Sequence, residues 1–185
     1  MQELINHYKN VALSDKDVLQ LVDGKANIIL YPELYKVKEI DQILDPYGAC
    51  FLLYESRPHN GHWCSLLKTN DKQGEVLEFF DPYGAGTLPN MIDRYAGFPD
   101  SELKYIPTEF RSESNQDIPY LGHLLLNSDY YLSFNQYPFQ KFGEHIKSCG
   151  RWCALRIIFK NLTLDQFKEL FLNNHSDDLV TFLTI

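Results

Sequence analysis

The stretch His62–Asp81, HWCSLLKTNDKQGEVLEFFD, decides the fold because it reads as two strands joined by a polar, glycine-containing hairpin loop. The strands are predicted over residues 62–68 and 75–81. In an antiparallel pair the residue numbers of facing residues have a constant sum, so pairing Lys68 with Glu75 also pairs His62 with Asp81. Facing residues place their Cβ atoms roughly 5 Å apart on one face of the sheet. The sequence therefore predicts an imidazole beside a carboxylate, which a register slip of one residue would separate.

The rest of the chain supplies further strands and helices around this hairpin. Ser14 with Asp17, and Thr163 with Gln166, are residue pairs typical of helix starts. The patterns predict strands over 49–55, 103–106 and 130–134, helices over 14–22 and 164–173, and a short helix within 84–100. The chain has 185 residues and is 44% hydrophobic, which suffices for one core. We therefore expect a single domain, residues 1–185, that contains both helices and strands.

Charge and apolar patterning exclude several classes of protein. The net charge of −8 weighs against nucleic-acid binding, which needs a basic face. No apolar run approaches the roughly 20 residues that span a bilayer, and the N-terminus lacks a signal-peptide pattern. We therefore expect an intracellular protein without a membrane partner. In that setting the four cysteines are not expected to form a disulfide framework.

A candidate nucleophile lies in the tract Ser148-Cys149-Gly150-Arg151-Trp152-Cys153-Ala154-Leu155-Arg156. Cys149 is the candidate nucleophile, at the start of an apolar and therefore central, buried helix. The positive end of the helix dipole lowers a thiol pKa there. The exposed backbone N–H groups of Cys149 and Gly150 can receive an oxyanion. Gly150 also lets a substrate backbone approach closely.

Three other residues complete the candidate site. His62 is the candidate base for the thiol proton, and Asp81 fixes its tautomer and stabilises the imidazolium. Gln140, nine positions before Cys149, can donate a second hydrogen bond to the oxyanion. Trp63 is expected beside the site, as part of the substrate-binding surface. No metal and no cofactor are expected.

Other interpretations of these residues stay open. Cys149 alone can be a core residue, and the segment after Phe80 can be an ordinary turn. A zinc site built from His62, Cys64, Cys149 and Cys153 lacks the usual knuckle spacing. A redox pair of Cys149 and Cys153 has three intervening residues, whereas the thioredoxin-like motif has two.

The order of the motifs along the chain resembles that of the adenovirus-type (adenain-like) maturation cysteine proteases. The motifs are His62-Trp63, then Phe80-Asp81-Pro82-Tyr83-Gly84, then Gln140 and then Ser148-Cys149-Gly150. The order is shared with the wider group of SUMO-specific, Ulp1-like proteases. The acid-Pro-aromatic-Gly turn points to the viral branch. The Cys-Gly-Arg-Trp tract looks closest to proteases of virophages, polintons and related large DNA viruses. The resemblance covers about residues 48–160.

The resemblance implies an α+β fold with a mixed β-sheet packed between helices and the nucleophile at the N-terminus of a central helix. It implies a His62/Asp81/Cys149 triad with Gln140 in the oxyanion hole. The substrates would be viral capsid or core precursor proteins, cut in the virion or in the viral factory of the host-cell cytoplasm. A peptide activator is left open.

Three other functions also remain open. The first is a Ulp1-like isopeptidase that removes ubiquitin-like modifiers, and the second is an acetyltransferase with a similar triad. The third is a catalytically idle binding scaffold.

Overall fold

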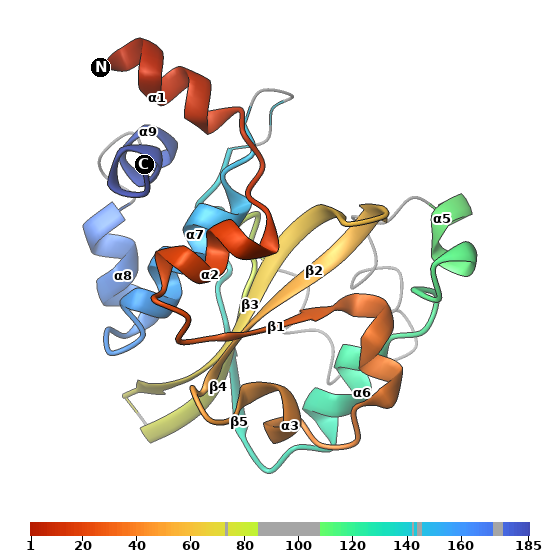
Figure 1. Cartoon of the computed structure of the whole chain (residues 1–185). Coiled ribbons are helices and arrows are strands. Elements are labelled where there is room, and N and C mark those ends of the chain that lie inside the picture. The colour runs from red at the N-terminus through yellow and green to blue at the C-terminus, as the bar shows by residue number, and fades with distance from the viewer. Residues whose placement is uncertain (73, 85–107, 142, 144–145, 172–175) are drawn as a thin grey trace.

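A five-stranded mixed sheet forms the centre of the protein, here a computed structural model that describes all residues except 73, 85–107, 142, 144–145 and 172–175 (Figure 1). The strands lie in chain order, with β1–β2 and β4–β5 parallel and the two inner pairings antiparallel. They are β1 (Asn27–Leu30), β2 (Ala49–Arg57), β3 (Asn60–Asp71), β4 (Gly74–Phe80) and β5 (Tyr131–Phe134). The predicted strands at 49–55 and 130–134 are therefore confirmed as parts of β2 and β5.

Helices pack on both faces of the sheet. Apolar residues of α2 (Asp15–Leu21), α7 (Cys149–Ile158), α8 (Leu164–Phe171) and α9 (Ser176–Leu183) form one core cluster. Those of η1 (Tyr31–Lys36), α3 (Asp41–Leu44) and α6 (Tyr120–Leu126) form the other. In Figure 1, α1 (Gln2–Lys9) lies beside α9 near both termini, and α5 (Thr108–Glu113) lies at the opposite side. The predicted class, a mixed sheet packed between helices, is confirmed at this level.

Strand β2 shows why a continuous apolar run became a strand. Its residues point alternately to the two faces. Phe51 and Leu53 enter the cluster that contains α7, whereas Leu52 and Tyr54 enter the other. Because both faces are covered by helices, every position from Ala49 to Glu55 is buried. A strand covered on both sides loses the polar–apolar alternation of a half-exposed one.

The β3–β4 hairpin forms, but the predicted register is wrong by two residues. Lys68 pairs with Leu77, and Glu75 pairs with Asn70. The strands extend into the expected loop, as far as the pair of Asp71 and Gly74. A shift of two preserves which face each side chain occupies. His62 and Asp81 therefore remain on one face, although both lie beyond the pair of Ser65 and Phe80, the end of the β3–β4 register nearest to them.

The predicted helix starts are confirmed where a side chain caps the first turn. Ser14 and Asp17 form a reciprocal capping box at α2. Thr163 and Gln166 form the same pair of hydrogen bonds at α8, which ends at Phe171. The predicted strand 103–106 and the short helix within 84–100, beyond residue 84, fall outside the described residues.

Helix α7 is the buried helix expected from the sequence, and nine of its ten residues are buried. A salt bridge fastens it to the sheet: Arg156 Nε and Nη2 each lie 2.7 Å from the carboxylate oxygens of Glu78 on β4. Both side chains are at most 1% exposed. The bidentate geometry holds the C-terminal turn of the helix against β4.

None of the helices in the described parts of the chain combines the length and the apolar composition needed to cross a membrane.

Candidate active site

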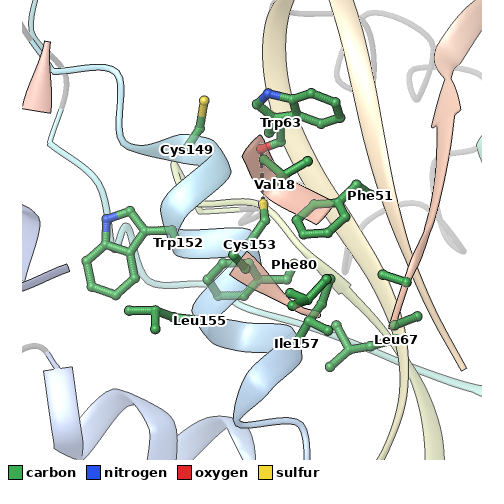
Figure 2. Packing of buried hydrophobic residues seen from close by; sticks show 14 of the residues in the cluster. Val18, Phe51, Trp63, Leu67, Phe80, Cys149, Trp152, Cys153, Leu155 and Ile157 are labelled. Carbon is green, nitrogen blue, oxygen red and sulfur yellow. Dashed lines mark hydrogen bonds between the residues drawn. The ribbon is translucent and has the colours of Figure 1, made fainter. Parts of the chain in front are cut away.

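Cys149 is the first residue of α7 and lies at the edge of the core, 9% exposed. The hydroxyl of Ser148, at the N-cap position, makes no cap hydrogen bond and instead donates to Asp177 at 2.6 Å. The first-turn N–H groups of α7 are therefore not capped by this side chain. Figure 2 shows the Cys149 sulfur pointing away from the cluster of apolar side chains.

His62 lies beside both predicted partners. Its Nε2 lies 2.8 Å from Asp81 Oδ1, and both side chains are at most 7% exposed. A further hydrogen bond joins the imidazole to the Cys149 side chain. The three residues predicted from the sequence are therefore brought together, and their order is thiol, imidazole, carboxylate.

The pKa values of this pair move in opposite directions. Burial opposes the charged form of His62, but the charge and hydrogen bond of Asp81, followed by Cys149, raise its pKa to about 9. Burial likewise opposes a thiolate at Cys149. However, the hydrogen bond and charge of His62, with backbone hydrogen bonds from Trp63 and Gly150, hold the pKa of Cys149 below its ordinary range. The arrangement favours a thiolate–imidazolium pair, which is an activated nucleophile.

The site opens into a cleft of about 480 Å³. One wall is the connection between α1 and α2, and the other is the turn between β2 and β3. The lining residues are Ala12, Leu13, Ser14, Leu53, Ser56, His59, Asn60, Gly61, His62, Trp63, Tyr83, Gln140, Ile146, Lys147 and Cys149. A group held in this cleft can reach the sulfur and the imidazole together.

Trp63 lies at the cleft as predicted, although it is only 3% exposed. Its Nε1 donates to the carbonyl of Leu13 at 3.0 Å, which fixes the α1–α2 connection against β3. A Cβ atom at Gly150 would lie 3.0 Å from Val18 and 3.1 Å from Trp63. The space beside Gly150 is therefore filled by the protein itself, and the glycine serves the close packing of α2 and β3 on α7 rather than leaving room for a substrate backbone.

Gln140 borders the same cleft and is 1% exposed. Its Nε2 donates to the carbonyl of Ile146 at 3.0 Å and to the hydroxyl of Tyr83 at 3.2 Å. The amide is thus close to the site, but its two N–H groups already have acceptors. An oxyanion would have to compete with these two oxygens for the amide.

The structure adds two residues that hold Asp81 in place and that sequence reasoning missed. The ring of Tyr83 stacks on His62 with a centroid distance of 4.6 Å, and its N–H donates to Asp81 Oδ1 at 2.9 Å. Asn135 accepts from the Asp81 N–H at 2.9 Å and donates to its carbonyl at 2.6 Å. Tyr83 belongs to the Asp-Pro-Tyr-Gly turn, so its place close to Asp81 in the sequence could have indicated a role at the site. The residues around Asn135 in the sequence contain no pattern that indicates its contact with Asp81.

Asp177 is the third residue that sequence reasoning missed. It accepts hydrogen bonds from the Ser148 hydroxyl, from Trp152 Nε1 at 3.0 Å and from the Lys141 N–H at 3.0 Å. The carboxylate is 5% exposed and comes from the start of α9. It therefore joins α9 to the residue before the nucleophile and to the first turn of α7.

Two of the other three thiols differ from Cys149 in their pKa values. Cys153 is fully buried and donates to the Trp63 carbonyl at 3.4 Å (Figure 2). Burial, followed by the charge of Cys149, raises the pKa of Cys153 well above its ordinary value. Burial also raises the pKa of Cys50 to about 12. Both of these thiols are therefore packing groups rather than nucleophiles.

Among the described residues, one group with metal-ligand chemistry overlaps the site. The ligand atoms of His62, Cys64 and Asp81 all lie within 4.8 Å of one another. This differs from the zinc set considered from the sequence, because Asp81 takes part and neither thiol of α7 does. A metal ion bound there would replace the proton between His62 and Asp81, so metal binding and the triad geometry exclude each other.

Comparison with known proteins gives one informative relative. The chain is 44% identical over 191 residues to the uncharacterized protein V9 of Sputnik virophage, and the alignment covers all of both chains. No model of a known protein family matches the chain. No solved structure matches it either.

Proposed function

The chain belongs to the family of protein V9 of Sputnik virophage, and we propose that it is a cysteine endopeptidase that processes capsid or core precursor proteins during virion maturation. The observation that carries the proposal is the contact series from Cys149 through His62 to Asp81, beside a cleft that Cys149 and His62 line. The virophage relative supports a viral substrate. We propose the virion and the viral factory in the host-cell cytoplasm as its place of action.

We also propose that the fold is the adenain-like arrangement shared with the Ulp1-like proteases. Two features of the structure support this. The nucleophile begins a buried helix that packs on a mixed sheet, and the base comes from an inner strand, β3. The acid follows directly after the neighbouring strand, β4.

In the proposed reaction, the Cys149 thiolate attacks the carbonyl carbon of the scissile peptide bond. The C–S bond forms, and the carbonyl oxygen becomes an oxyanion near the N-terminus of α7, whose dipole favours negative charge. His62 then gives its proton to the leaving amine as the C–N bond breaks, which leaves a thioester on Cys149. Water, deprotonated by His62, hydrolyses the thioester and restores the pair. Asp81 stabilises the imidazolium at each stage.

The test is incubation of the purified protein with the capsid and core proteins encoded in the same viral genome, followed by mass spectrometry of the fragments. Cleavage by the wild type and its loss in Cys149→Ala support the proposal. Cys153→Ala is the matched control, since it removes a thiol one turn later on the same helix, and we expect it to retain cleavage. Wild-type rates in Cys149→Ala would refute the assignment.

A second arm separates the proposed substrate from the alternatives. SUMO, NEDD8 and ubiquitin probes are offered under the same conditions. Reaction with these probes and not with the viral proteins would replace the endopeptidase by an isopeptidase. No reaction with either, together with equally slow iodoacetamide alkylation of Cys149 and the other thiols, would favour a binding scaffold.

A further inference from the structure

The side-chain amide of Gln140 already donates hydrogen bonds to two protein oxygens in this structure. A primary amide carries two N–H donors. One accounts for the hydrogen bond to the Ile146 carbonyl at 3.0 Å, and the other for that to the Tyr83 hydroxyl at 3.2 Å. Gln140 is 1% exposed, so its rotation would disturb packed surroundings. The group expected to stabilise an oxyanion therefore points its donors at two other oxygens, and one of these is a hydroxyl.

Tyr83 lies beside the candidate triad. The tyrosine lines the cleft together with Cys149, and its ring stacks on His62 with an interplanar angle of 19°. The Tyr83 N–H also donates to Asp81, so the backbone is fixed as well as the ring. Tyr83 is thus held by contacts to the acid, the base and Gln140 at once.

The hydroxyl of Tyr83 keeps the proton that a hydrogen-bond donor needs. Burial, followed by the negative charges of Cys149, Asp81 and Asp177, raises the pKa of Tyr83 to about 12. The phenol therefore keeps its proton throughout the neutral range. Because a hydroxyl is both donor and acceptor and its hydrogen rotates, it can accept from Gln140 while it donates into the cleft.

We propose that the Tyr83 hydroxyl is a catalytic residue that donates a hydrogen bond to the oxyanion formed at Cys149, and that Gln140 is a positioning residue that holds this hydroxyl. This inference rests on the proposed acyl-transfer function. No covalent bond to Tyr83 forms or breaks, because the phenol proton only moves toward the oxyanion as negative charge develops there. The site then uses the Tyr83 hydroxyl together with the backbone N–H groups at the start of α7.

The first test is Tyr83→Phe, which keeps the ring on His62 and removes the hydroxyl. The loss of one oxyanion donor costs about 10²- to 10³-fold in kcat, and we expect that loss with KM changed by less than about threefold. Alkylation of Cys149 by iodoacetamide should stay within about twofold, since the thiolate–imidazolium pair is retained. Tyr120→Phe is the matched control, because it removes a hydroxyl that contacts Asn115 on the other side of the sheet. It should leave kcat unchanged.

The second test is a double-mutant cycle. If Gln140 acts by holding Tyr83, Gln140→Ala should lower kcat in the wild type and should add less than about tenfold in the Tyr83→Phe background. A Tyr83→Phe enzyme with near-normal kcat, beside a Gln140→Ala enzyme that is strongly impaired, would overturn the inference. Multiplicative losses would also overturn the positioning role of Gln140.

A third measurement separates this inference from the proposed function. N-acetylglycinal, a minimal peptide aldehyde, adds reversibly to a thiolate: the C–S bond forms and the carbonyl oxygen becomes a tetrahedral oxyanion. Tyr83→Phe should weaken this adduct about 10- to 100-fold, as expected for a hydrogen bond to a charged group. The measurement applies even if no protein substrate is cleaved, which would defeat only the endopeptidase proposal. Equal adduct affinity in wild type and Tyr83→Phe would exclude Tyr83 as a donor.

Discussion

Replacing Asp81 with asparagine tests the electrostatics of the site most directly. The substitution keeps the size of the side chain but removes the charge that lies 2.8 Å from His62 Nε2 in a buried position. A hydrogen bond to a charged group contributes about 1.5–3 kcal/mol, and each 1.4 kcal/mol is about a factor of ten. The thiolate–imidazolium form should therefore become roughly 10- to 100-fold less favoured relative to the neutral pair.

The direction of the effect follows from the causes of the two pKa shifts. Asp81 raises the pKa of His62, and the proton on His62 lowers the pKa of Cys149. Without the carboxylate, the pKa of His62 should fall and that of Cys149 should rise toward its ordinary range. Alkylation of Cys149 near neutral pH should then slow about tenfold or more, and recover as the pH approaches the ordinary pKa of a thiol, about 8.5.

The assay is the rate of iodoacetamide alkylation as a function of pH, read by mass spectrometry of the peptide that contains Cys149. Asp41→Asn is the matched control, since it makes the same change on α3, whose apolar residues belong to the core cluster on the other face of the sheet. We expect the control to give the wild-type profile. A profile for Asp81→Asn that coincides with the wild type would refute the inferred coupling between carboxylate, imidazole and thiol.

Three further predictions concern the fold and the pH dependence. Gly61→Ala should lower the free energy of unfolding in urea by about 1–3 kcal/mol or more, because the added Cβ would lie 1.8 Å from a backbone oxygen of β2. The control is Gly143→Ala, whose Cβ would make ordinary contacts. It should change the free energy of unfolding by less than about 0.5 kcal/mol. Glu78→Leu should lower the free energy of unfolding by about 3–5 kcal/mol, because it leaves the buried guanidinium of Arg156 without its carboxylate. The double variant Glu78→Leu with Arg156→Met should recover most of this loss. An unchanged free energy of unfolding in Glu78→Leu would contradict this prediction. Peptidase activity should decline as the pH rises through about 9, where His62 loses its proton, and should also decline as the pH falls through the lowered pKa of the thiol; a rate that keeps rising well above pH 9 would contradict the inferred ion pair.

Several features of this chain could be predicted because they depend on residues close together in the sequence. The capping boxes at Ser14 and Thr163 each join residues three apart, so the helix starts follow from local chemistry. Strand alternation has a period of two, so a register error of two residues left His62 and Asp81 on the same face. The contact between base and acid was therefore predicted correctly from an incorrect pairing.

Other features depend on contacts between distant segments. Ser148 and Asp177 are 29 residues apart, and Asn135 is 54 residues from Asp81. No periodicity links these pairs, because their meeting depends on how α9 and the segment after β5 pack against α7 and β4. The same holds for Gly150, whose need for a small side chain is set by Val18 and Trp63 from other elements.

The sequence by itself determined the class of elements, the β3–β4 hairpin and the residue types of the candidate site, because backbone propensity and side-chain periodicity act over a few residues. Tertiary structure alone decided the hydrogen bonds of the Gln140 amide to Ile146 and Tyr83 and the stacking of Tyr83 on His62. These depend on distances and angles between separate elements. Close packing and buried hydrogen bonds set such distances only when the whole chain is folded.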